Sequence, residues 1–203
     1  FWELRGPNGS GKTSLITMII GDNPKAYGQE LYLFGNRKGS GESVWDIKAK
    51  IGYFTPALTD RFRGNHTAEA MLISGLLDSV GLYVKPTDQQ RTLALNWLAL
   101  LGLSDRGRTQ FRNLSEGHQR LLMCARAMIK HPPVLILDEP TAGLDEASSG
   151  LLISLVQKMA AESETAILFV SHRKEPGLKA PKVLELKPGK AGSKGIIHDF
   201  ITP

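Results

Sequence analysis

The sequence predicts an α/β protein: a mostly parallel sheet with flanking helices, an inserted helical subdomain and a small antiparallel β portion. Two observations support this prediction. Short apolar runs that end in polar residues alternate with amphipathic helical patterns, which is typical of parallel strands joined by helices. Between about residues 67 and 130 the pattern is helical throughout, which indicates an insert. A chain of 203 residues is long enough for one domain with a subdomain.

The most informative stretch follows a short strand-like lead, residues 1–5, and reads Gly6-Pro7-Asn8-Gly9-Ser10-Gly11-Lys12-Thr13. It matches the phosphate-loop pattern G-x-x-x-x-G-K-[ST]. Glycines let the backbone turn tightly, so that successive N–H groups converge on an anion, and the apolar helix expected over residues 13–20 aims its dipole at the same point. A Gly-Ser linker is the alternative, which the strand before the loop and the helix after it disfavour.

The loop therefore predicts a P-loop NTPase core that binds a nucleotide and Mg²⁺. We expect Gly6 to Ser14 to contact the phosphates. Lys12 adds a full positive charge within reach of the β- and γ-phosphates, and Thr13 offers its hydroxyl to the metal.

Before the insert we expect a strand at 30–34 closed by Gly35-Asn36, a short helix capped by Ser43, and a strand at 51–54 ended by Pro56. Within 67–130 we expect three helices, of which the third opens at Ser115. After the insert we expect a strand at 134–137, a helix at 146–162, a strand at 166–170, and two candidate edge strands at 183–186 and 195–197. Cys124 falls on the apolar side of the third insert helix and is interpreted as a small core residue.

Polar residues follow two of the predicted strands and are expected to meet the phosphate loop. Ligands of open α/β sheets bind beyond the carboxyl ends of the strands. Asp138, at the end of the apolar run 134–137, has the position of a Walker-B carboxylate that holds Mg²⁺ together with Thr13. Glu139 is suited to polarise the attacking water, and His172 to position that water or the γ-phosphate. The alternatives are a helix N-cap for Asp138-Glu139 and an ordinary polar loop residue for His172.

These residues carry a family resemblance. The run Leu114-Ser115-Glu116-Gly117-His118-Gln119-Arg120 resembles the ABC ATPase signature, commonly L-S-G-G-Q-Q-R. The segment from Pro140 to Asp145 is similar to the family's D-loop, and Ser171-His172 to its switch histidine. Five motifs occur in the family's order and spacing over nearly the whole chain. The resemblance implies ATP hydrolysis at a head-to-tail dimer interface, where the signature of one domain (Leu114 to Gln119) closes over ATP held by the other, with Asp145 in the D-loop.

Some segments resemble one subgroup of this family. Segments such as Val44-Trp45-Asp46-Ile47-Lys48 and Asp78-Ser79-Val80-Gly81-Leu82-Tyr83 are similar to the C-terminal half of molybdenum-transport-type or photorepair-type proteins with tandem ATPase domains. This implies a second ABC ATPase domain as partner, in the same polypeptide or as another copy, with a membrane permease as a further candidate and a molybdate-type transport role. We expect residues 1–203 to form one ABC domain truncated at its N-terminus, with a core at 1–66 and 130–203 and a signature subdomain at 67–129.

Composition restricts the remaining options. No apolar run is long enough to cross a bilayer, no secretion leader is visible, and a single cysteine excludes an internal disulfide. We therefore expect a cytoplasmic address, with a peripheral position on the inner face of the membrane as a variant. The net charge of +5 is scattered, without a basic stretch interleaved with aromatic residues, so nucleic acid is not an expected partner.

Several residues depart from the family pattern. Thr55-Pro56-Ala57 stands where most members have a glutamine that senses Mg²⁺ and couples to the transporter. Glu116 and His118 replace the usual glycine and glutamine of the signature, and the adenine-stacking aromatic would lie before Phe1. These departures leave open a cytosolic ATP-dependent clamp, or a regulatory or repair ATPase without a permease. A GTPase is disfavoured, because no Asn-Lys-x-Asp motif occurs.

Overall fold

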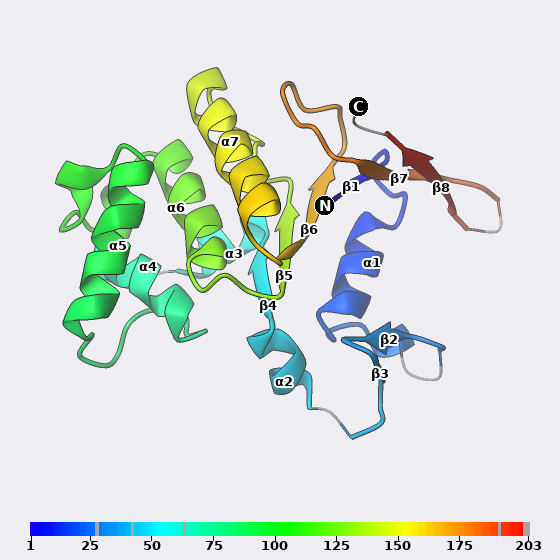
Figure 1. The fold of residues 1–203 in the computed structure, drawn as a ribbon, viewed down its shortest axis with the longest axis horizontal. Helices are drawn as coiled ribbons and strands as arrows, with labels where there is room; N and C mark the ends of the chain where they lie inside the picture. Colours follow the sequence, from blue (N-terminus) through cyan, green and yellow to red (C-terminus); the bar gives the residue numbers. More distant parts are fainter. Residues whose placement is uncertain (27–28, 42, 63, 191, 201–203) are drawn as a thin grey trace.

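A six-stranded sheet forms the centre of the protein. The computed structural model describes residues 1–26, 29–41, 43–62, 64–190 and 192–200. The strands lie in the order β4-β5-β6-β1-β7-β8 (Figure 1). The first five are mutually parallel, and β8 runs antiparallel to β7. The mostly parallel sheet predicted from the sequence is therefore confirmed. The bounds of these strands are β1 (Trp2–Arg5), β4 (Ile51–Phe54), β5 (Val134–Asp138), β6 (Ala166–Ser171), β7 (Lys182–Lys187) and β8 (Lys194–Asp199).

The two C-terminal strands exist, but the prediction that both are edge strands is wrong for β7. This strand pairs in parallel with β1 on one side and with β8 on the other, so only β8 lies at that edge. The order of strands across a sheet depends on pairings between distant segments, which a local pattern does not contain.

A second, two-stranded sheet supplies further antiparallel structure. It consists of β2 (Tyr32–Leu33) and β3 (Asn36–Arg37), which pair antiparallel. Asn36, expected in a closing loop, is therefore the first residue of a strand. Phe34 and Gly35 make the turn, both with positive φ (51° and 82°), and glycine adopts such a conformation without steric cost.

The helices begin at polar caps, as their sequences suggest. Thr67, Thr87, Ser115 and Asp145 each accept a hydrogen bond from the backbone N–H three residues on, and Ser43 and Asp46 form a reciprocal capping box. The helices are α1 (Lys12–Ile19), α2 (Val44–Ala49), α3 (Pro56–Arg61), α4 (Ala68–Leu76), α5 (Asp88–Leu100), α6 (Glu116–Met128) and α7 (Glu146–Glu162), with short 3₁₀ turns η1 (Pro24–Ala26), η2 (Ser104–Arg106) and η3 (Phe111–Asn113).

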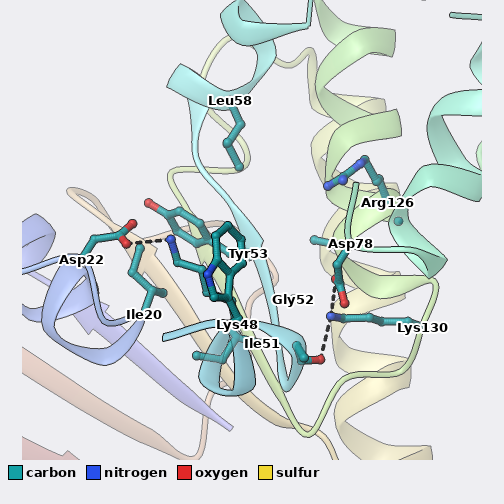
Figure 2. Close-up of a pocket in the computed structure, with 14 residues that line it drawn as sticks. Ile20, Asp22, Lys48, Ile51, Gly52, Tyr53, Leu58, Asp78, Arg126 and Lys130 are labelled. Atoms are coloured by element: carbon teal, nitrogen blue, oxygen red, sulfur yellow. Dashed lines mark hydrogen bonds and ion pairs between the residues drawn. The ribbon is translucent and has the colours of Figure 1, made fainter. Parts of the chain in front are cut away.

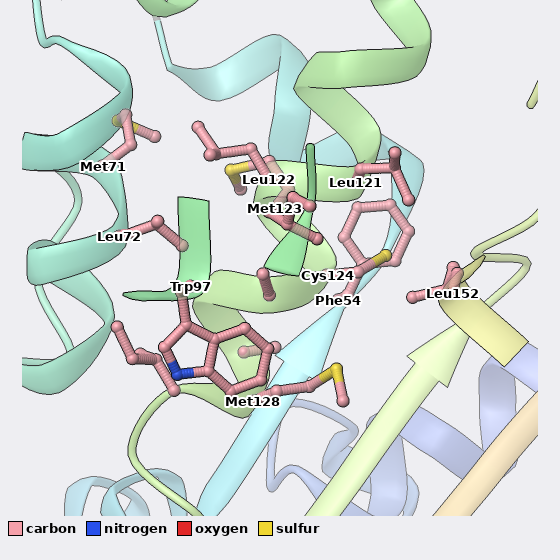
Figure 3. Packing of buried hydrophobic residues seen from close by; sticks show 14 of the residues in the cluster. Phe54, Met71, Leu72, Trp97, Leu121, Leu122, Met123, Cys124, Met128 and Leu152 are labelled. Atoms are coloured by element: carbon pink, nitrogen blue, oxygen red, sulfur yellow. The ribbon is translucent and has the colours of Figure 1, made fainter. Parts of the chain in front are cut away.

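Both faces of the sheet are buried. Along β5, Leu135 and Leu137 belong to one apolar cluster, and Ile136 between them belongs to another; Phe169 and Val170 of β6 divide in the same way. The larger cluster is built with α4, α5, α6 and α7 (Figure 3), and the smaller one with α1 and α2. This explains why the strands read as continuous apolar runs.

The helices α4, α5 and α6 pack on one another and form a group beside the sheet (Figure 1). Its centre is apolar, with Trp97, Leu122 and Met128 among the residues drawn in Figure 3. Cys124 is fully buried in this cluster, and burial raises the pKa of its thiol, as fits a core residue. Within the part of the chain that the structure describes, none of the helices has the length and apolar character needed to cross a bilayer.

Candidate functional site

The phosphate-loop stretch forms the turn between β1 and α1. Gly9 and Gly11 have φ angles of 79° and 92°, which non-glycine residues rarely adopt, and a Cβ on either would meet nothing within 4 Å. These two glycines therefore serve the backbone conformation, and the space beside them is open. Gly6 is different, because a Cβ there would lie 2.6 Å from Ser10 Oγ and 2.8 Å from the carbonyl oxygen of Leu186.

Lys12 is held against its own loop. Its side chain is 7% exposed, and Nζ donates to the carbonyl oxygens of Gly6 (2.7 Å) and Pro7 (3.1 Å). An ammonium group has three hydrogens, so one donor remains for a ligand. The buried hydroxyl of Ser10 has no hydrogen-bond partner in the described structure. The third hydrogen of the Lys12 ammonium group and the Ser10 hydroxyl are therefore hydrogen-bond donors without a partner in the described structure.

A cavity of about 600 Å³ opens beside the loop, and three separate segments line it. The first is the loop and the start of α1, from Asn8 to Ser14 without Ser10; the second is Thr55-Pro56-Ala57, which follows β4; the third is Asp138-Glu139, which follows β5. The structure thus places Lys12 and Thr13 on the same cavity as Asp138 and Glu139. The parallel strands bring their carboxyl ends to this one edge of the sheet.

The surroundings of Asp138 disfavour the ionised form of its carboxyl group. Burial raises the pKa of its carboxyl, and the neighbouring Glu139 raises it further, while a hydrogen bond from Thr55 and the charge of Lys12 act in the opposite direction. Thr55 Oγ1 donates to Asp138 Oδ2 at 3.4 Å. A cation in the cavity would favour the ionised carboxylate, so this group is set up to accept one.

Glu139 occupies a strained backbone position and contacts the predicted switch histidine. Its φ is 49°, in the left-handed region that an L-residue seldom occupies, and its N–H donates to the carbonyl oxygen of Val170 at 2.9 Å. His172, which follows β6, lies with Nδ1 2.9 Å from Glu139 Oε2. Polar residues after two neighbouring strands are therefore in direct contact.

The residues that resemble the signature, Leu114 to Gln119, lie outside the cavity beside the phosphate loop. None of Leu114 to Gln119 is among the residues that line the cavity beside the phosphate loop. Ser115 caps α6 by accepting a hydrogen bond from the His118 N–H at 3.3 Å, and Gln119 Nε2 donates to the Leu114 carbonyl at 2.9 Å. Glu116 is exposed at the first turn of the helix. The chain therefore does not bring its own signature to its own phosphate loop.

The segment between β5 and α7 connects the two regions. Arg120, one turn into α6, donates a hydrogen bond to the carbonyl oxygen of Ala142. Asp145 caps α7 by accepting hydrogen bonds from the Ser148 backbone N–H (2.7 Å) and hydroxyl (3.1 Å), and these bonds lower the pKa of its carboxyl. Sequence reasoning missed the Arg120 contact, because nothing local signals it.

Thr55 is the cavity residue whose role the sequence did not indicate. From the sequence, the segment Thr55-Pro56-Ala57 stands out only because it contains no glutamine. The available signal was the place of Thr55 one residue after the strand predicted at 51–54, because ligands of open α/β sheets bind beyond the carboxyl ends of the strands.

A second cavity, of about 270 Å³, lies between α2, β4, α4 and α6 (Figure 2). Its cations are engaged with the protein itself. Lys48 pairs with Asp22 at 2.6 Å and Lys130 with Asp78 at 2.5 Å, while the Arg126 guanidinium donates to Ser74 Oγ and to the Ser79 carbonyl. The cavity beside the phosphate loop is consequently the better place for a phosphorylated ligand.

Comparisons with known proteins agree with this geometry. The family described as "ABC transporter" matches residues 1–142. The chain is 44% identical over 175 residues to the ABC transporter ATP-binding protein ModF of Escherichia coli, covering 86% of this chain and 36% of ModF. It is 32% identical over 203 residues to the uncharacterized ABC transporter ATP-binding protein YlmA of Bacillus subtilis, covering 99% of this chain and 76% of YlmA. The chain thus spans about a third of the length of ModF.

Two solved structures share the fold. The first is a dimeric post-hydrolysis state of the ATP-binding cassette MJ0796 bound to ADP and Pi, with a TM-score of 0.76, 23% identity, and coverage of 92% of this chain and 81% of that one. The second is cbiO1 from Clostridium perfringens, part of the ABC transporter complex cbiONQ, with a TM-score of 0.77, 22% identity, and coverage of 98% and 76%.

Proposed function

The chain belongs to the ABC transporter family, whose ATP-binding domains hydrolyse ATP, and from this premise we propose that it does so with Mg²⁺ at a head-to-tail interface with a second ABC domain. The observation that carries the proposal is the cavity shared by the phosphate loop and Asp138-Glu139, from which the signature residues are absent. In this proposal the phosphate loop with Asp138-Glu139 is one half of a composite site, and the signature residues serve the site of the second domain.

The phosphate loop binds the nucleotide. Lys12 and backbone N–H groups between Gly6 and Ser14 supply positive charge, apart from Pro7, which has no N–H, and Ser10, whose N–H donates to the Pro7 carbonyl. Gly11 at the N-cap of α1 has no side chain to occupy the N–H groups of the first turn. No acidic residue lies in that turn to repel an anion.

Mg²⁺ fits the oxygen donors that line the cavity. Thr13 and Asp138 offer one hydroxyl and one carboxylate. Such a pair suits a metal that keeps several waters and takes one or two protein ligands plus phosphate oxygens. When bound, the metal would neutralise charge on the phosphates.

Glu139 acts as general base for the attacking water, and His172 positions the Glu139 carboxylate. A general base must lie within hydrogen-bond reach of the proton that it removes, and Glu139 lines the cavity that receives the γ-phosphate. The 2.9 Å contact of His172 Nδ1 with Glu139 Oε2 holds the carboxylate in one orientation.

The signature completes the site of the partner domain. Leu114 to Gln119 lie at the N-terminal end of α6, where N–H groups and the helix dipole suit a phosphate. Asp145 belongs to the segment that Arg120 ties to this helix. The partner domain is either part of the same polypeptide or another copy, and the dimeric state of the MJ0796 cassette, which shares the fold, supports this arrangement.

We assign residues 1–66 and 130–203 to the P-loop core and 67–129 to the signature subdomain. The similarity to ModF supports a molybdate-type transport ATP-binding protein that works in the cytoplasm or peripherally on the membrane with a permease. One observation favours an ATPase without a permease: Thr55-Pro56-Ala57 lines the cavity without a glutamine.

The test is steady-state phosphate release by wild type and by Glu139→Gln. Loss of a general base should lower the rate by at least about 100-fold while ATP binding is kept. Glu162→Gln, the same change at the exposed end of α7, is the control and should match wild type. A wild-type rate no faster than that of Glu139→Gln contradicts hydrolysis by this site.

A further inference from the structure

The residue after β4 contacts the carboxylate at the end of β5. The two strands are parallel, and Phe54 lies opposite Leu137 as the last pair of their ladder, so Thr55 and Asp138 each follow that pair by one residue. Thr55 Oγ1 donates to Asp138 Oδ2 at 3.4 Å, and among the described residues it is the one side chain that donates to Asp138. Both side chains line the cavity beside the phosphate loop.

The Thr55 hydroxyl is not used for the role its position suggests. Thr55 is the N-cap of α3, with extended backbone angles (φ −143°, ψ 149°), yet its side chain makes no capping hydrogen bond. Threonine at such a position ordinarily accepts a hydrogen bond from the N–H of the second or third helical residue. Pro56, at the first helical position, has no N–H, and the N–H of the third helical residue, Leu58, donates to the Thr55 backbone carbonyl at 2.9 Å. The hydroxyl is therefore turned to Asp138 instead of to its own helix.

We propose that Thr55 is a positioning residue for Mg²⁺: its hydroxyl orients the Asp138 carboxylate toward the metal that this carboxylate and Thr13 would hold. This inference rests on the proposed Mg-ATP site and deepens it. The distance of 3.4 Å is long for an O–H···O bond, and the effect we assign to this bond is to fix one carboxylate oxygen and leave the other for the metal or its water.

The chemistry separates this role from a structural one. A residue that orients a metal ligand affects nucleotide binding only when the metal is present. A residue that merely supports the cavity wall affects binding with and without metal. The ratio of nucleotide affinity in Mg²⁺ to affinity in EDTA is therefore the informative quantity, and turnover is not required to measure it.

The experiment is calorimetric titration with a non-hydrolysable ATP analogue, in Mg²⁺ and in EDTA. Thr55→Val keeps the shape and the β-branch but removes the hydroxyl, and should lower the affinity in Mg²⁺ by about three- to tenfold, the equivalent of one hydrogen bond. Its affinity in EDTA should stay within about twofold of wild type. Thr55→Ser keeps the hydroxyl and should restore the Mg²⁺ affinity.

Thr59→Val is the matched control. It makes the same change one turn along α3, on a residue that does not line the cavity and whose hydroxyl has no partner in the described structure. It should leave both affinities unchanged. Equal losses for Thr55→Val in Mg²⁺ and in EDTA, or no loss in either while wild type gains affinity from Mg²⁺, overturn the role of Thr55 alone. If wild type gains no affinity from Mg²⁺, the metal site itself is refuted, and this inference with it.

Discussion

Asp138 is more useful to a ligand than to the fold. Burial and the adjacent Glu139 both raise the pKa of its carboxyl. A carboxyl with a folded-state pKa above its unfolded value binds protons more readily when folded, so its ionised form costs stability at neutral pH. That cost disappears as the pH falls through the folded pKa toward the ordinary value of about 3.9.

We therefore expect Asp138→Asn to raise the melting temperature of the nucleotide-free protein at pH 7 in EDTA. The advantage should shrink as the pH falls toward about 4 and disappear below it, where the wild-type carboxyl is protonated in both states. Differential scanning calorimetry across this range measures the effect. An equal melting temperature at pH 7, or an advantage that grows on acidification, would contradict a destabilising charge at Asp138.

Asp145→Asn provides a comparison of opposite sign. Hydrogen bonds from Ser148 lower the pKa of Asp145, so its ionised form contributes stability above the unfolded pKa, and that contribution is lost as the pH falls through the folded pKa. The same Asp-to-Asn change should therefore not stabilise the protein at this site. Two carboxylates seven positions apart thus differ in sign because one is buried beside another acid and the other caps a helix.

Helix α6 is the element on which the larger apolar cluster depends, because it contacts α4, β4 and α7. Its approach to α4 is close enough to require glycine. A Cβ on Gly75 would lie 2.3 Å from the Arg126 carbonyl oxygen and 2.9 Å from Arg126 Cγ. The backbone atom cannot move without displacing α6, so Gly75 sets the separation of the two helices.

We expect Gly75→Ala to destabilise the protein by about 1–3 kcal/mol, the usual cost of overpacking a core. Gly150→Ala makes the same change in the exposed part of α7, where a Cβ meets nothing within 4 Å, and should stabilise by about 0.5–1 kcal/mol through helix propensity. Urea unfolding monitored by circular dichroism distinguishes the two. Similar midpoints for both variants would refute the close packing of α4 on α6.

Local patterns predicted the elements better than their arrangement. The run 134–137 and the cap at Ser115 were sufficient to locate β5 and α6. Helix α3 was not predicted, because Pro56 was interpreted only as the end of β4, although proline is also favoured at the first position of a helix. The inner position of β7 was not predictable, since it depends on pairing with β1 far away in the chain.

At the scale of the whole molecule, the phosphate loop precedes α1 and the signature-like run opens α6, in different parts of the described chain. The sequence identified both motifs, because each is a short contiguous run. Their separation appears only in the structure, where the cavity beside the loop includes no signature residue. The contact of Thr55 with Asp138 likewise depends on the strand register and has no contiguous motif.

The proposed dimer predicts a variant that folds and binds ATP but does not turn it over. Gly117 lies near the N-terminus of α6, and a Cβ there would meet only Leu144 Cδ2, at 3.7 Å. Gly117→Asp should therefore keep its stability within about 0.5 kcal/mol of wild type. A carboxylate facing the partner's γ-phosphate should abolish ATP-driven dimerisation and lower phosphate release by at least about tenfold.

Sedimentation velocity with ATP, paired with a phosphate assay, tests this prediction. Gly150→Asp introduces the same charge on the exposed face of α7 and should behave as wild type. Full turnover by Gly117→Asp, with its fold intact, would show that the signature does not face a partner's nucleotide.

The central place of β1 has a consequence for how the protein is made. This strand holds the phosphate loop, yet its sheet partners are residues 168–171 and 182–185. On a ribosome adding about 5–20 residues per second, the nascent loop waits on the order of ten seconds or more before either neighbour emerges. The loop can therefore be anchored in the sheet only after β6 has been synthesised, and a premature stop before β6 would leave the nucleotide site without its neighbouring strands.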